Sequence, residues 1–129
     1  MMKKLVFLLL TVMILTACGQ AKENDQGGGI CDITAEEAKQ IMDSEEGYII
    51  LDVRTQEEYD EGHISGAIVI SHEEITEKAE EVLTDKDQLI LVYCRSGRRS
   101  KIAAEALVEL GYTNIKEFGG IIDWPYEVE

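Results

Sequence analysis

Two runs made almost entirely of apolar residues constrain the fold of this chain more than any other feature of its sequence. The first is Tyr-Ile-Ile-Leu-Asp-Val at residues 48–53, and the second lies within residues 88–93 with Leu-Ile-Leu-Val at its centre. Neither run alternates apolar with polar side chains, as a strand with one face in water would. Each fits a strand of a parallel sheet that is buried on both faces.

Three segments carry the signals of helices. Residues 34–37 and 71–74 match the capping box, in which a Thr or Ser and a Glu three positions later satisfy each other's backbone N–H groups. They predict helices that open there, and the second is expected to run through Leu83. A third helix is predicted over residues 100–110, with one apolar face and with Gly111 closing it.

Shorter apolar stretches complete an alternation of strands and helices. They are predicted to be strands at residues 30–33, 67–70 and 115–118, and residues 57–59 form a short helical turn. Alternating strands and helices with short links are typical of an α/β domain. The 129 residues suffice for one domain. We expect residues 30–129 to form a mostly parallel five-stranded sheet with helices on both faces.

The charge of the chain excludes one class of partner. There are 12 Lys and Arg against 26 Asp and Glu, which gives a net charge of −14. Such a chain repels a phosphate backbone, so we expect no binding to nucleic acid. The two histidines, His63 and His72, do not form a pair with the spacing of metal ligands, and we assign no metal and no cofactor.

The first seventeen residues follow the pattern of a secretory signal. Lys3 and Lys4 are followed by an apolar run over residues 5–15 and by small residues before Cys18. The alternative is a transmembrane anchor, but residues 5–17 are well short of the ~20 that a spanning helix needs. The segment therefore predicts export.

The end of this signal, Leu-Thr-Ala-Cys at residues 15–18, resembles the lipobox of bacterial lipoproteins. The resemblance implies that residues 1–17 are removed and that Cys18 is acylated on sulfur. Residues 18–29 would then be the lipidated Cys and a polar, Gly-rich tether with a reach of roughly 15–20 Å. We expect an exported lipoprotein, anchored by lipid alone on the outer side of the cytoplasmic membrane or in the cell envelope.

The segment between the second apolar run and the last helix carries the chemistry. It reads Cys94-Arg95-Ser96-Gly97-Arg98-Arg99-Ser100. Ligands of open α/β sheets bind at the carboxyl ends of strands, and a helix N-terminus lowers the pKa of a nearby thiol. Gly97 permits a curled backbone, and three arginines make a local anion site. The alternative is a buried structural Cys followed by a solvated basic loop.

This segment resembles the active-site loop of single-domain rhodaneses, and further blocks follow the order of that family. These blocks are Leu51–Arg54, Glu58-Tyr59, Gly62–Ala67, Gly119-Gly120 and Asp123-Trp124. Ser65 departs from the family, which usually has proline there. The resemblance implies a rhodanese-like fold over about residues 32–124.

The resemblance also implies a sulfurtransferase with Cys94 as nucleophile. Cys94 would take a sulfane sulfur from a small anionic donor such as thiosulfate and pass it, as a persulfide, to a thiol or cyanide. The donor and the persulfide would be held by the loop, which comprises Arg95, Ser96, Gly97, Arg98, Arg99 and Ser100. An alternative is a carrier without turnover, or a redox or interaction module, that docks on another exported protein. A phosphatase or arsenate reductase would need Cys-x5-Arg, but that position holds Ser100.

The remaining candidates are interpreted as structural. Asp52 and Arg54 favour an ion-pair network at a strand end, with Glu58 as a possible partner of Arg54. Trp124 is expected in the core. Cys31 is interpreted as a free, partly buried thiol, and the alternative is a disulfide with Cys94. We expect a monomer.

Overall fold

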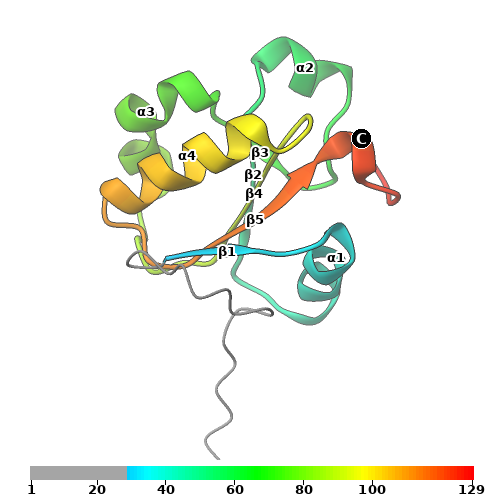
Figure 1. The fold of residues 1–129 in the computed structure, drawn as a ribbon, viewed down its shortest axis with the longest axis horizontal. Coiled ribbons are helices and arrows are strands. Elements are labelled where there is room, and N and C mark those ends of the chain that lie inside the picture. Colours follow the sequence, from blue (N-terminus) through cyan, green and yellow to red (C-terminus); the bar gives the residue numbers. More distant parts are fainter. Residues whose placement is uncertain (1–28) are drawn as a thin grey trace, which may run out of the picture.

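The computed structural model describes residues 29–129, and its centre is a five-stranded sheet in the order β1-β5-β4-β2-β3 (Figure 1). The strands are β1 Ile30–Asp32, β2 Ile49–Asp52, β3 Ile68–Val69, β4 Ile90–Cys94 and β5 Ile115–Gly120. All neighbouring strands pair in parallel. The expected α/β fold is therefore confirmed. The signal, Cys18 and the tether before residue 29 lie outside the described residues.

Helices cover both faces of this sheet, as the two apolar runs require. The helices are α1 Ala35–Ser44, α2 Gln56–Glu61, α3 Ile75–Val82 and α4 Arg98–Glu109, and short 3-10 turns cover His72–Glu74 and Ile121–Asp123. Buried residues of α3 and α4 pack on one face, and α1 packs on the other (Figure 1). None of the helices in residues 29–129 has the length and apolar character of a membrane-spanning segment.

The two apolar runs become the neighbouring strands β2 and β4. Leu51 lies opposite Val92 in the register, and both are fully buried. The five residues of β4 are all buried, because β5 and β2 flank the strand and helices cover its two faces. The carboxyl end of this central strand therefore lies in the middle of the sheet edge.

The helix starts agree only in part with the predicted caps. Thr34 and Glu37 form the expected capping box of α1. Ser71 makes no side-chain cap, because the N–H of Glu74 bonds to the backbone oxygen of Ser71 at 2.7 Å. A 3-10 turn therefore precedes α3, which begins at Ile75. Conversely, α2 has a capping box between Thr55 and Glu58 that the sequence analysis overlooked.

The structure also corrects the prediction for Cys31. Cys31 lies in β1 and is disulfide-bonded, so the expectation of a free thiol there is wrong. Cys94 is free, which excludes a disulfide between these two residues. Trp124 is 9 % exposed and lies in the core, as expected.

Candidate active site

Cys94 ends β4 directly before the loop that leads into α4. Its side chain is buried at 1 % exposure, and Sγ accepts a hydrogen bond from the backbone N–H of Gly97 at 3.0 Å. The hydroxyl Oγ of Ser100, in the first turn of α4, lies 3.4 Å from Sγ. The loop therefore curls back over the sulfur, as the strand–loop–helix pattern predicts.

The surroundings of Cys94 favour the thiolate. Burial by itself raises the pKa of the Cys94 thiol, but hydrogen bonds to the Ser100 hydroxyl and to the backbone N–H groups of Ser100, Gly97 and Ser96 lower it. The hydrogen bonds prevail, and the pKa lies below its ordinary value. A lowered pKa gives Cys94 the thiolate character that a sulfur nucleophile requires.

Glycines set the shape of the loop. Gly97 is the N-cap residue of α4 with φ of 107°, a left-handed conformation that side chains disfavour. Gly120, in β5, lies directly beneath the loop, where an added Cβ would be 2.0 Å from the carbonyl oxygen of Arg95. The Gly119-Gly120 pair that the sequence showed as part of the family pattern is thus the surface on which the loop lies.

The three arginines of the loop differ in their surroundings. Arg95 and Arg98 are exposed, whereas Arg99 is half-buried. The guanidinium of Arg99 forms two bonds to the carboxylate of Glu58 in α2, at 2.7 and 3.0 Å. This pair lowers the pKa of Glu58 to about 2. Arg99 therefore ties α4 to α2, and Arg95 and Arg98 are the loop cations open to solvent.

Asp52 and Arg54 form an ion pair with each other. The Nη2 atom of Arg54 lies 2.6 Å from Oδ2 of Asp52 and also donates to the carbonyl of Gly62 at 2.7 Å. The hydroxyl of Tyr93 donates to the same Asp52 oxygen at 2.6 Å. The suggestion that Arg54 pairs with Glu58 is wrong, because each has another partner. The network joins β2, β4 and the turn at Gly62.

Glu117 is a residue of this site that the sequence analysis missed. It lies in β5, is 2 % exposed, and accepts from the Ser100 hydroxyl at 2.5 Å. A signal was present, because Glu117 shares an alternating face of the strand with the buried Ile115. A charged side chain on the buried face of a strand is unfavourable unless it is paired or hydrogen-bonded, so its presence there indicates a specific partner.

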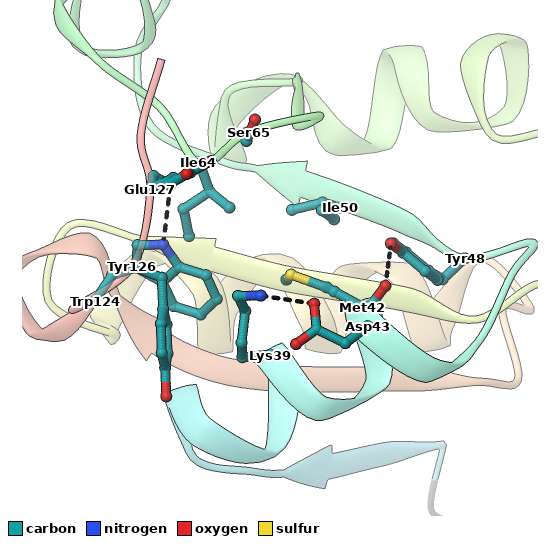
Figure 2. A pocket seen from close by; sticks show the side chains of 10 residues that line it. All are labelled: Lys39, Met42, Asp43, Tyr48, Ile50, Ile64, Ser65, Trp124, Tyr126 and Glu127. Atoms are coloured by element: carbon teal, nitrogen blue, oxygen red, sulfur yellow. Dashed lines mark hydrogen bonds and ion pairs between the residues drawn. The ribbon is translucent and has the colours of Figure 1, made fainter.

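A cavity of about 470 Å³ is formed by residues outside the Cys94 loop (Figure 2). It is lined by α1, the start of β2, the turn at Ile64 and the C-terminal segment, through Lys39, Met42, Asp43, Tyr48, Ile50, Ile64, Ser65, Trp124, Tyr126 and Glu127. Cys94 is not among these residues. The polar side chains that line the cavity largely bond to each other or to nearby backbone, as Lys39 does to Asp43 at 2.6 Å. The sulfur of Cys94 therefore lies apart from this cavity.

Comparison with known proteins agrees with this geometry. The family model described as "Rhodanese-like domain" matches residues 34–125. The chain is 41 % identical over 73 residues to the thiosulfate sulfurtransferase PspE of Escherichia coli, a match that covers 57 % of this chain and 70 % of that protein. It is 36 % identical over 112 residues to the putative sulfur carrier protein YrkF of Bacillus subtilis, which covers 86 % of this chain and 60 % of that relative.

Solved structures give the same result. The chain resembles a structure titled "rhodanese with anions from E. coli" with a TM-score of 0.60 and 36 % identity, over 64 % of this chain and 96 % of that one. The relatives named as sulfurtransferases support a role in sulfur transfer. From its fold, its cysteine loop and these matches, the chain belongs to the rhodanese-like domain family.

Proposed function

We propose that this protein is a sulfurtransferase that moves a sulfane sulfur from a donor such as thiosulfate to a thiophilic acceptor through a persulfide on Cys94. The observation that carries the proposal is the sulfur at the end of β4, with the N–H of Gly97 at 3.0 Å and a pKa below its ordinary value. A covalent two-step route needs an activated nucleophile and donors that stabilise the anions it forms.

The proposed sulfur transfer takes place in two steps, and bonds and charges balance in each. The Cys94 thiolate attacks the outer sulfur of thiosulfate, a new S–S bond forms, and sulfite leaves with the electron pair of the bond that breaks. A thiolate or cyanide then attacks the outer sulfur of the persulfide, and Cys94 leaves as the thiolate. The exposed Arg95 and Arg98 favour the approach of an anionic donor. A related solved structure is described as containing anions.

The test is thiosulfate:cyanide turnover of the purified protein, with intact mass after thiosulfate alone. We expect an adduct of about 32 Da, one sulfur atom, and turnover that Cys94→Ser abolishes. Cys31→Ser is the matched control and should keep both. A folded, reduced protein that forms no adduct would contradict the proposal.

A persulfide carrier is the second candidate, because one relative is named a putative sulfur carrier protein. The chain spans 60 % of that relative's length. A carrier would form the same adduct but would not turn over with cyanide, and a docked protein would take the sulfur instead. The phosphatase alternative lacks support, since the arginine nearest its required position, Arg99, is bound to Glu58.

We further propose export as a lipoprotein, with Cys18 acylated and residues 1–17 removed, on the basis of the N-terminal sequence. Expression in a bacterial host followed by mass analysis of the N-terminal peptide tests it. A diacylglyceryl mass on Cys18 that Cys18→Ser abolishes is expected, and an intact N-terminus would contradict it.

A further inference from the structure

A groove on the face of the sheet that α1 covers lies apart from Cys94. It consists of the cavity of about 470 Å³ in Figure 2 and of a second hollow of about 570 Å³. Tyr48, Ile50 and Ser65 line both hollows, so the two adjoin. The second hollow is further lined by Glu45, Glu46, Gly47, Ile49, Gly66 and Ile68. We call the two hollows together the α1 groove.

The floor of the α1 groove is apolar and aromatic. It comprises the buried Ile50, Ile64 and Trp124 and the half-buried Met42, Tyr48 and Tyr126. The ring of Tyr126 stands edge-on to Trp124, with 4.9 Å between the ring centres. Aromatic residues of this kind are enriched at protein interfaces, where a few of them carry most of the binding energy. The floor therefore offers anchoring points for apolar side chains of a ligand.

The rim of the α1 groove carries an excess of negative charge. Four carboxylates, those of Asp43, Glu45, Glu46 and Glu127, line the groove, against the single ammonium group of Lys39. Lys39 pairs with Asp43 at 2.6 Å. The side chains of Glu45, Glu46 and Glu127 are exposed and make no hydrogen bond or ion pair with residues 29–129. The groove is therefore complementary in charge to a cationic ligand.

The end of α1 adds to this negative potential. The last turn of α1 contains no basic residue, and the C-cap residue is Glu45. A helix C-terminus carries a partial negative charge, so that cations are favourable there and carboxylates are not. A cationic ligand at this end of the groove would therefore relieve the repulsion between the carboxylates and the helix end.

The α1 groove also holds one ammonium group of the protein itself. Nζ of Lys39 lies 5.6 Å from the centre of the Tyr126 ring while it pairs with Asp43. This distance is within the ~6 Å of a cation–π contact. Figure 2 shows Lys39 between the other two side chains at the edge of the cavity. An aromatic ring and a carboxylate of this groove are thus arranged to bind an amine.

We propose that the α1 groove binds a basic segment of a partner protein, one that combines Lys or Arg with apolar side chains. The apolar side chains lie on the floor, and the cationic ones lie against the carboxylates of the rim. A pocket for a small molecule buries most of its ligand, whereas this groove is open and rimmed by exposed residues, which suits a segment of chain. The inference does not depend on sulfur transfer, because Cys94 lines neither hollow.

Trp124 is the one tryptophan of the chain and lies in the groove, so its fluorescence reports on binding there. The probe is the peptide acetyl-Lys-Leu-Lys-Phe-Lys-Leu-Lys-amide, titrated into the full-length protein. We expect a saturable change in the emission of Trp124. A peptide with Glu in place of each Lys, and one with Ser in place of Leu and Phe, should each bind at least about tenfold more weakly. No saturable change with the first peptide, or equal binding of all three, would overturn the inference.

Two matched pairs of variants locate the binding. Glu127→Gln should weaken binding of the Lys peptide about threefold, whereas Glu109→Gln makes the same charge change at an exposed position at the end of α4 and should not. Ser65→Arg adds a bulky cation where the two hollows meet and should abolish binding, and Thr84→Arg, exposed after α3, should keep it. Equal effects within either pair would mean that overall charge attracts the peptide, and the inference would be wrong.

A single amine distinguishes a chain segment from a small ligand. N-acetyl-lysine amide carries the cation without apolar neighbours. It should leave the emission of Trp124 unchanged at concentrations at which the Lys peptide saturates the protein. If it binds as tightly as the peptide, the α1 groove is a site for small amines, and the proposed docking of a protein segment is contradicted.

Discussion

At the scale of single residues, the active site depends on close approach between backbone segments. The loop that follows Cys94 lies on β5, and it comes so close that Gly120 has no room for a side chain. Gly120 has φ of −135°, an ordinary extended value, so its requirement for glycine comes from space and not from conformation. The sequence showed a Gly-Gly pair but not this reason for it.

Gly120→Ala is therefore expected to displace the loop. The new Cβ would meet the carbonyl oxygen of Arg95 at 2.0 Å and Cα of Ser96 at 2.6 Å, so backbone has to move. Overpacking of this kind costs about 1–3 kcal/mol of stability. We expect sulfur transfer to fall at least about tenfold, since geometry at the nucleophile changes. Turnover and urea unfolding check this, and full activity would show that the loop position is not critical.

At the scale of elements, α2 and α4 are joined by one ion pair that also belongs to a helix cap. Glu58 closes the capping box of α2 with Thr55 and at the same time binds Arg99 of α4. The carboxylate therefore stabilises the start of one helix and the attachment of another. Both contacts favour its ionised form, which explains why the pKa of Glu58 falls to about 2.

A lowered pKa makes this contribution depend on pH in a defined direction. The folded protein holds Glu58 ionised, so the stabilisation is fully present above the ordinary pKa of 4.5 and is lost as pH falls from there to about 2. For a carboxylate that is 26 % exposed we expect about 1–2 kcal/mol. Urea unfolding of Glu58→Gln should show this loss at pH 7 and a smaller one near pH 2.

Glu57→Gln is the control for that experiment, because Glu57 is the exposed neighbour in the same helix turn. It should leave stability nearly unchanged at both pH values. Equal losses in the two variants would mean that overall charge, and not the bond to Arg99, determines the effect.

At the scale of the whole molecule, a buried polar network holds together parts that are distant in sequence. Asp52 of β2 binds Arg54, accepts from Tyr93 of β4, and through Arg54 reaches the turn at Gly62. The Tyr93 hydroxyl in turn accepts from the N–H of Ile64. This network fixes the strand ends on which the active-site loop depends.

Asp52→Asn should be severely destabilising. The substitution leaves Arg54 with a buried charge that has lost its counter-ion, and breaking a buried pair in this way costs about 3–5 kcal/mol. The free energy of unfolding in urea measures the loss. Asp43→Asn removes a carboxylate from the exposed pair with Lys39 and should change little. A comparable loss in both variants would contradict the role assigned to the buried pair.

The sequence predicted those parts of the molecule that depend on local patterns. The apolar run of β4, the helix α4 and the capping box at Thr34 each reflect neighbours in the chain, and each was confirmed. The pair Arg99–Glu58 and the contact of Glu117 with Ser100 join residues 41 and 17 positions apart. Such contacts depend on how helices pack on the sheet, which periodicity does not specify.

The central position of β4 determines at what stage of unfolding the site around Cys94 is disrupted. Each residue of this strand is buried, and β5 and β2 pair with it on its two sides. Exposing the amides of such a strand requires the cooperative opening of the entire sheet. Hydrogen exchange in β4 should therefore be among the slowest in the molecule, and activity should vanish in the same transition as secondary structure. Cys94 would then be among the last parts of the protein to unfold.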